Sequence, residues 1–270
     1  MNYHGKKVVV TGSTGFIGSA LSKALGDAGA IVINVNGDLR RKNELAPFFD
    51  HQIDYCFHFG GPSSQILFKR QPMYSADVTV NGFINLAELC QHYGIKLIYP
   101  STGLLSQGKM NEYAKCKSVL EDMAEGIDAL GLRIFATYGP GEGHKANFAS
   151  VPYLFARDMV EGVPPVIYGD GSQSRDFVYI SDVVTAILEL AEQATEKIID
   201  VGYGVPTSFN AIISELEKVL NYKAEVVRVP KPDNYVEETL ADTSVLKRYG
   251  VAPLIDFPTG LREVVDELKK

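Results

Sequence analysis

Two side chains four residues apart, Tyr113 and Lys117 in the segment NEYAKCK, are the first candidates for chemistry in this chain. On a helix this spacing places both side chains on one face. An ammonium group near a phenol favours the phenolate, so Tyr113 could act as a general base near neutral pH. Taken alone, the spacing is more typical of a surface tyrosine and a solvated lysine, so a second motif is needed.

The second motif is the segment Lys6–Ser19, KKVVVTGSTGFIGS. Val8 to Val10 predict a buried parallel strand, because they show no polar alternation. Gly12, Gly15 and Gly18 follow, and a helical pattern of alanine and leucine comes after them. Such glycines allow a tight turn and let backbone N–H groups approach a pyrophosphate at the start of a helix, where the helix dipole adds positive charge. Strand, turn and helix in this order predict a dinucleotide-binding site.

Further elements must bring the two motifs together. Gln71–Tyr93 has helical spacing, and Asn81 within it is expected to be a buried anchor that bonds to a nearby loop. Ile95–Tyr99 predicts a strand that ends in Pro100, Ser101 and Thr102, just before the Tyr113–Lys117 helix. Joined to this strand end and to the glycine turn, the pair indicates catalysis beside a bound dinucleotide.

The choice between NAD and NADP stays open in the sequence. The predicted strand Ala30–Val35 ends at Asn36, where an NAD site normally has an acidic residue for the ribose hydroxyls. Asp38 follows, and then Arg40 and Arg41, which either hold a 2′-phosphate or lie in solvent.

The next predicted strand, Asp54–Gly61, contains His58, which we expect to be a packed side chain, and ends in Gly60 and Gly61. Few residues separate Asn36 from the start of this strand. A strand–helix pair that dinucleotide-binding folds commonly have at this point is therefore expected to be trimmed or missing.

Composition limits the class of protein. A chain of 270 residues can hold one large domain or a domain with a smaller lobe. A net charge of −7 argues against a broad nucleic-acid surface. Cys56, Cys90 and Cys116 lack metal-type spacing and predict reduced thiols in a cytoplasmic protein. The first residues do not resemble a signal peptide, and no apolar run approaches the ~20 residues of a membrane span.

Together these motifs resemble the extended short-chain dehydrogenase/reductase family of NAD(P)-dependent nucleotide-sugar epimerases and dehydratases. The resemblance extends over residues 6–268 and rests on the segments TGSTGFIG, FHFGG, VNGFINLAELC, YPST, YAKCK, LRIFATYGPG and GDGSQSRDFVYISDVV. The segment GPGEGHKANFASV is especially similar to ADP-heptose epimerases and archaeal sugar-nucleotide epimerases.

The resemblance implies roles for individual residues. Tyr113 would be the general base, Lys117 would hold the nicotinamide ribose and lower the tyrosine pKa, and the hydroxyl of Thr102 would bridge the sugar and Tyr113. The NAD or NADP site implied in this way consists of Gly12, Ser13, Thr14, Gly15, Phe16, Ile17, Asn36, Asp38, Leu39, Arg40, Phe59, Gly60, Gly61, Ser101, Tyr113 and Lys117. The implied contacts to a nucleotide-diphosphate sugar are Ser63, Thr102, Asn147 and Arg175. An ordinary salt bridge of Arg175 to Asp176 or Asp182 is the alternative for that arginine, and His144 and Lys145 either reach a phosphate or lie in solvent.

Three departures limit this transfer. The loop between Thr102 and Tyr113 is short, and Ala136 stands where the family often has a substrate-binding asparagine. Gly103 and Leu104 follow Thr102 in place of the Asp–Glu pair of 4,6-dehydratases. Because elimination of water needs an acid to protonate the leaving hydroxyl, these two residues weaken the dehydratase interpretation.

The expected fold is a doubly wound α/β (Rossmann) domain, residues 1–138 with 177–203, and a smaller substrate-binding lobe, residues 139–176 and 204–270. The expected function is epimerisation at C4 or a neighbouring carbon through a transient keto sugar. A keto-sugar reductase or dehydratase, and a non-catalytic dinucleotide-binding regulator, are the alternatives. By resemblance, helices near Asn81–Tyr93 and Tyr113–Met123 would pair in a homodimer. No metal site is expected.

Overall fold

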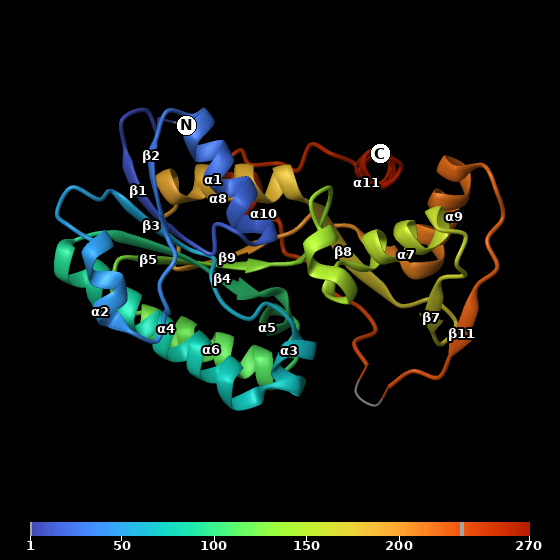
Figure 1. Ribbon diagram of the computed structural model, residues 1–270, viewed down its shortest axis with the longest axis horizontal. Helices are drawn as coiled ribbons and strands as arrows, with labels where there is room; N and C mark the ends of the chain where they lie inside the picture. The colour runs from blue at the N-terminus through green and yellow to red at the C-terminus, as the bar shows by residue number, and fades with distance from the viewer. Residues whose placement is uncertain (1, 233–234) are drawn as a thin grey trace.

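Six parallel strands form the central sheet of the computed structural model, which describes residues 2–232 and 235–270 (Figure 1). Their spatial order is β2-β1-β3-β4-β5-β9. The strands are Lys7–Thr11 (β1), Ile31–Val35 (β2), Tyr55–His58 (β3), Lys96–Thr102 (β4), Ala129–Ile134 (β5) and Ile198–Val201 (β9). Val8, Val9 and Val10 are fully buried because helices cover both faces of the sheet, which explains why the sequence of this strand does not alternate.

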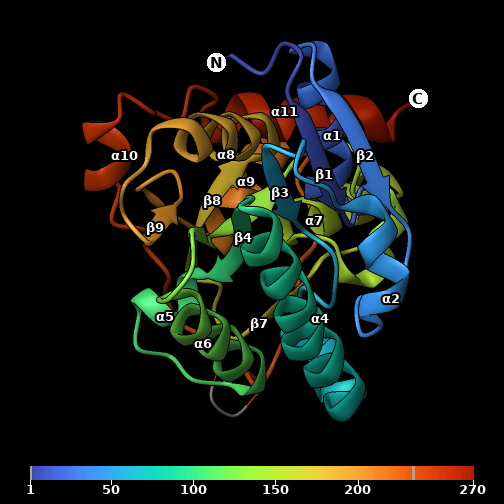
Figure 2. The same ribbon diagram turned by 90° about the vertical axis from the view of Figure 1, so that its left-hand side faces the viewer.

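Helices cover the two faces of the sheet in pairs. On one face lie α1 (Phe16–Asp27) and α8 (Ile180–Gln193), and on the other lie α4 (Pro72–Tyr93) and α6 (Glu112–Ala124) (Figures 1 and 2). The predicted doubly wound α/β arrangement is therefore confirmed. In the part of the chain that the structure describes, no helix has both the length and the apolar character to cross a bilayer.

The edge of the sheet is formed by β2. Its connection to β3 contains only α2 (Lys42–Leu45) and the 3-10 turn η1 (Ala46–Phe48). Doubly wound sheets of this type commonly have a further strand outside the second one. The predicted trimming of a strand–helix pair is thus confirmed.

The strands outside the central sheet form two small sheets at one end of the molecule (Figure 1). A three-stranded sheet has the order β10-β8-β6, and β11 pairs with β7. Consequently only β9 of the returning segment joins the central sheet, while β8 belongs to the small one. The elements not yet given are α3 (Gln65–Arg70), α5 (Gly103–Ser106), β6 (Ala136–Tyr138), η2 (Gly143–Phe148), α7 (Val151–Val160), β7 (Val166–Tyr168), β8 (Ser174–Tyr179), β10 (Pro206–Ser208), α9 (Phe209–Leu220), β11 (Val227–Val229), α10 (Ser244–Arg248) and α11 (Phe257–Leu268).

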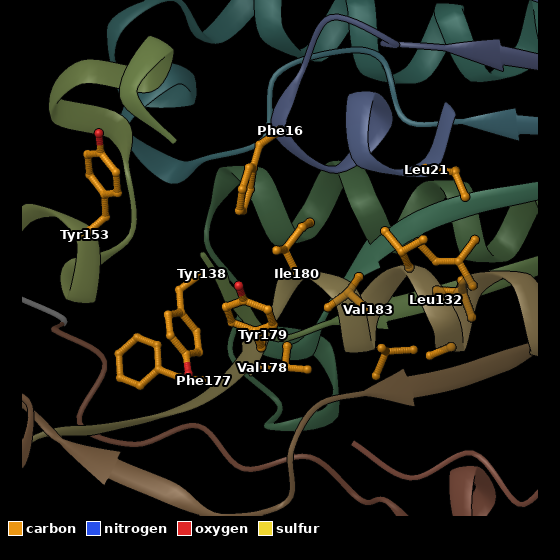
Figure 3. Close-up of a cluster of buried hydrophobic side chains, with 14 of the residues drawn as sticks. Phe16, Leu21, Leu132, Tyr138, Tyr153, Phe177, Val178, Tyr179, Ile180 and Val183 are labelled. Carbon is orange, nitrogen blue, oxygen red and sulfur yellow. The ribbon is translucent and has the colours of Figure 1, made fainter. Parts of the chain in front are cut away.

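A continuous hydrophobic core joins the central sheet to these C-terminal elements. Leu21 of α1 and Val183 of α8 pack above the sheet, while Tyr138, Phe177 and Tyr179 continue the core toward the small sheet (Figure 3). The Tyr138 and Tyr179 rings meet edge to face with centroids 5.6 Å apart, a favoured aromatic geometry. The end of β4 and the start of α1 therefore lie on a rigid scaffold.

A buried carboxylate fixes the chain beyond β9. Asp176 is fully buried and accepts hydrogen bonds from the backbone N–H groups of Tyr203, Gly204 and Ala241, at 2.7, 2.9 and 3.0 Å. It forms no ion pair with its neighbour Arg175, so its role is to satisfy backbone donors that would otherwise be buried without partners.

Candidate active site

The glycine turn has the geometry that its sequence predicts. Gly12 has a φ of +73°, and a Cβ atom there would lie 2.4 Å from the carbonyl oxygen of Phe59, so only glycine fits. Helix α1 starts directly after the turn, with Gly15 as its N-cap. This helix start has no side-chain cap and no acidic residue in its first turn. Its backbone N–H groups and positive dipole end are therefore available to an anion such as a pyrophosphate.

A cleft of about 350 Å³ opens between this turn and the end of β4. It brings together residues from the glycine turn, from the end of β3 and from the proposed catalytic helix. The lining residues are Gly15, Phe16, Ile17, Gly18, Phe59, Gly60, Gly61, Pro62, Ser63, Pro100, Ser101, Tyr113, Lys117, Ile134, Phe135, Ala136, Thr137, His144 and Lys145.

A second cavity, of about 770 Å³, continues from the first and shares Gly61 and Pro62 with it. The predicted residues Asn36, Asp38 and Leu39 line it. The two cavities together form one groove along the carboxyl ends of the central strands, where doubly wound folds bind dinucleotides. The groove and the uncapped helix start fit a nicotinamide dinucleotide.

A buried histidine stabilises the floor of this groove. His58, at the end of β3, is 2% exposed, and its Nδ1 lies 2.8 Å from the hydroxyl of Thr11. The same hydroxyl accepts a hydrogen bond from the backbone N–H of Gly60 at 3.1 Å. Burial, and to a lesser degree the positive charge of Lys117, lowers the pKa of His58 to about 3, so this histidine is neutral. The expectation of a packed histidine is confirmed.

Tyr113 and Lys117 line the other wall of the cleft, and the buried Thr102 lies next to Tyr113 without lining the cleft itself. Thr102 ends β4 and forms a hydrogen bond to Tyr113, which lies in the first turn of α6. Lys117 follows one turn later and donates a hydrogen bond to the carbonyl oxygen of Pro100 at 2.8 Å. Its Nζ lies 5.8 Å from the centre of the Tyr113 ring. Phe68 of α3, which the sequence did not indicate, packs edge-on against that ring at 5.4 Å.

Burial acts on the ionisation of this cluster in two directions. It raises the pKa of Tyr113 to about 12, although the hydrogen bond from Thr102 opposes the rise. It lowers the pKa of Lys117 to about 8. In the protein alone the lysine therefore does not bring the tyrosine pKa down to neutrality, contrary to the expectation. A cationic ring in the cleft would add the attraction for a phenolate that is missing here.

Arg40 contacts Asp38 and Tyr74, two residues that line the second cavity, and is already engaged. Its guanidinium binds both oxygens of Asp38, at 2.9 and 2.6 Å, and reaches Asp77 at 3.4 Å. It also lies 5.0 Å from the centre of the Tyr74 ring. Arg41 contacts Glu44 at 2.9 Å. Arg40 cannot hold a phosphate without breaking its contacts, whereas the Arg41 side chain is 65% exposed, which agrees with the alternative that it lies in solvent.

Of the four predicted substrate contacts, Ser63 lines the cleft, whereas Thr102, Asn147 and Arg175 line neither cavity. Arg175 is placed between the rings of Phe209 and Tyr235, at 5.6 and 5.5 Å, and donates to backbone carbonyl oxygens. The alternative of a salt bridge from Arg175 to a neighbouring aspartate is therefore wrong. Asn147 lies in η2, and its Oδ1 accepts a hydrogen bond from Arg157 at 3.5 Å. Beside it, Lys145 lines the first cleft, pairs with Glu142 at 2.6 Å and lies 4.8 Å from the centre of the Phe16 ring.

Two side chains differ in their contacts from what the sequence suggested. Asn81 is exposed and bonds to Asp77, so the expectation of a buried anchor is wrong there. The anchor is Asn85, one turn later, which donates to the carbonyl oxygen of Leu39 at 2.8 Å and so supports the cofactor groove. Ser101 lines the cleft, but its hydroxyl is turned toward Glu121.

A dinucleotide groove that ends beside a Thr–Tyr–Lys cluster defines an α/β enzyme that oxidises or reduces its substrate with a nicotinamide cofactor. A sequence model of the family described as "NAD dependent epimerase/dehydratase family" matches residues 8–202, and the chain belongs to this family.

The chain is also similar over nearly its whole length to individual members of this class. A Methanocaldococcus jannaschii protein assigned as a UDP-glucose 4-epimerase is 27% identical over 97% of this chain and 98% of that protein. The structure of a UDP-glucose 4-epimerase from Thermotoga maritima with UDP-glucose has a TM-score of 0.92 at 25% identity, covering 97% and 98% of the two chains. A UDP-N-acetylglucosamine 4-epimerase from Methanobrevibacter ruminantium, in complex with UDP-N-acetylmuramic acid, has a TM-score of 0.90 at 26% identity, covering 98% and 99%.

Proposed function

We propose that the protein is a nucleotide-sugar 4-epimerase that keeps NAD bound and inverts the C4 carbon of a UDP-hexose. The observation that carries this proposal is that Tyr113 and Lys117 line the same cleft as the glycine turn, with Thr102 hydrogen-bonded to Tyr113. The similar proteins described above act on UDP-sugars, which makes UDP-glucose the first substrate to test.

The reaction follows from the positions of these side chains. The C4 hydroxyl gives its proton to the Tyr113 phenolate, with the hydroxyl of Thr102 holding the oxygen in place. When bound, oxidised nicotinamide would supply the hydride acceptor for that carbon and, once reduced, the hydride donor. Inversion of C4 would require the keto sugar to turn within the cleft and present its other face to the cofactor, and Tyr113 then gives its proton back to the sugar oxygen. Lys117 supplies positive charge that stabilises the phenolate.

The contacts of Arg40 favour NAD over NADP. A 2′-phosphate would have to displace the two carboxylates that hold the guanidinium, and it would add negative charge beside both of them. The uncapped start of α1 and the groove lined by Asn36, Asp38 and Leu39 would hold the dinucleotide.

Purified protein tests the function directly. With UDP-glucose we expect UDP-galactose to accumulate to equilibrium, followed by NMR, without a net absorbance change at 340 nm. The Tyr113→Phe variant should retain NAD and lose turnover. A steady consumption of added NADH would instead identify a keto-sugar reductase with an exchangeable cofactor. Turnover by Tyr113→Phe at the wild-type rate would refute the assignment of the base.

Three further expectations belong to the same proposal. Residues 139–176 and 204–270 would form the lobe that receives the sugar nucleotide. A homodimer would form through α4 and α6, which is supported by an apolar groove between these helices lined by Ile84, Ala87, Met123 and Ile127 among others. A cytoplasmic location is supported by three cysteines that form no disulfide.

A further inference from the structure

One face of helix α6 contacts three successive residues of strand β4. Tyr113, Lys117 and Glu121 are spaced by four residues and so share this face. Tyr113 bonds to Thr102, Lys117 to the carbonyl oxygen of Pro100 and Glu121 to the hydroxyl of Ser101, the last at 2.5 Å. Three contacts, one from each successive turn of α6, thus attach the helix that carries Tyr113 to the strand that carries Thr102.

The third of these contacts, made by Glu121, also includes a bidentate ion pair. Arg133 on β5 donates to both oxygens of Glu121, at 2.9 and 2.6 Å. Arg133 is the register partner of Ser101 in the sheet, so the carboxylate of Glu121 is held by two neighbouring strands at once. The side chains of Glu121 and Arg133 are 11% and 26% exposed, so the pair is partly buried, and its two-pronged geometry fixes orientation as well as distance.

The pair continues into a hydrogen-bonded chain behind the cleft. Arg133 reaches the hydroxyl of Ser106 at 3.5 Å, and Ser106 donates to Asp200 of β9 at 2.6 Å. This chain links α6, β4, β5, the short helix α5 and β9. Neither Glu121 nor Arg133 lines the cleft or the second cavity, so neither can touch a ligand there.

We propose that Glu121 and Arg133 are positioning residues, which set the axial position and rotation of α6 on β4 and thereby hold Tyr113 and Lys117 at their working distance from Thr102. The inference rests on the proposed function. A helix held only by the Thr102 and Pro100 contacts could shift along the strand, and a displacement of about 1 Å at a reacting group costs on the order of a hundredfold in rate.

The test compares Glu121→Gln, Arg133→Lys and the apolar double variant Glu121→Leu/Arg133→Met, with Glu125→Gln, an exposed position just beyond the end of α6, as the control. We expect kcat for UDP-glucose to fall about ten- to a hundredfold in each test variant, KM to stay within about threefold and NAD to remain bound. The double variant removes both charges together, which commonly preserves folding, and it keeps the test decisive if a single variant does not fold.

A second measurement does not depend on turnover. The ionisation of Tyr113 in the NAD-bound protein is followed at 295 nm, as the difference between each variant and the same variant carrying Tyr113→Phe. Loss of a nearby anion would by itself lower the pKa of the phenol, whereas loss of alignment with the hydroxyl of Thr102, whose hydrogen bond lowers this pKa, raises it. We therefore expect the pKa of Tyr113 to be higher in Glu121→Gln than in the wild type.

The outcomes are distinct. A kcat within twofold of wild type in the folded double variant, an activity loss that only follows the folded fraction, or an unchanged or lower Tyr113 pKa in Glu121→Gln would each overturn the positioning role. If wild-type protein does not epimerise UDP-glucose, the proposed function fails in that respect, and the titration of Tyr113 still tests the positioning.

Discussion

Lowering the pH should destabilise the protein through one buried side chain, His58. In the folded chain the pKa of this histidine is about 3, against 6.5 for an unperturbed histidine. Between these two pH values the unfolded chain binds a proton at this histidine and the folded chain does not. The contribution of His58 to the free energy of unfolding is therefore complete above pH 6.5 and decreases as the pH falls. From pH 7.5 to 5.5 the loss from this one group is about 1.4 kcal/mol, because one pH unit below the unfolded pKa corresponds to that free energy.

Urea unfolding at pH 7.5 and 5.5, followed by far-UV circular dichroism, measures this loss. The His58→Asn variant keeps a polar atom near the hydroxyl of Thr11 but cannot titrate. Its stability should therefore fall by about 1.4 kcal/mol less than that of the wild type over the same interval. The exposed His51, changed to Gln, is the matched control and should behave as the wild type does. An equal fall in wild type and His58→Asn would refute the argument that burial keeps His58 neutral.

Three other changes test the groove, the cluster and the scaffold. Gly12→Ala should weaken NAD binding at least about tenfold in calorimetry, because the added Cβ would meet backbone atoms at the end of β3. Gly26→Ala is the control, because a Cβ there meets nothing within 4 Å, and this variant should bind NAD as the wild type does. The kcat of epimerisation should fall as the pH rises through about 8, because Lys117 then loses its proton. If the Lys117→Arg variant shows the same fall of kcat at the same pH, another group causes it. Asp176→Ala should lower the free energy of unfolding by about 3 kcal/mol or more in urea titrations, since three buried N–H groups lose their acceptor. Asp170 is exposed, so a comparable loss of stability in Asp170→Ala would contradict this reason.

The parts of the fold that the sequence predicted are the ones that local physics determines. Val8 to Val10 and the three glycines form the strand and turn that their conformational preferences require. The four-residue spacing of Tyr113 and Lys117 put them on one helix face, and the polar end of β4 supplied Thr102. These features depend on neighbours in the chain, so a single sequence carries them.

The parts that the sequence could not predict depend on long-range contacts. Asn81 and Asn85 lie one turn apart on α4, and only the position of the loop at Leu39 decides which of them is the anchor. Arg175 has carboxylates close by in sequence, yet the packing of Phe209 and Tyr235 around it directs it elsewhere. Pattern alone also does not show that burial raises the Tyr113 pKa, since desolvation depends on everything that surrounds the ring.

The trimmed connection after β2 also exposes the protein to self-association. Within the described chain this strand has β1 as its sheet neighbour on one side only, so its other edge presents unpaired backbone groups. The strand is rich in β-branched residues, and Ile31 is 52% exposed. A strand with these properties can add a strand from a second copy of the chain, so at high concentration this edge is where aggregation would begin.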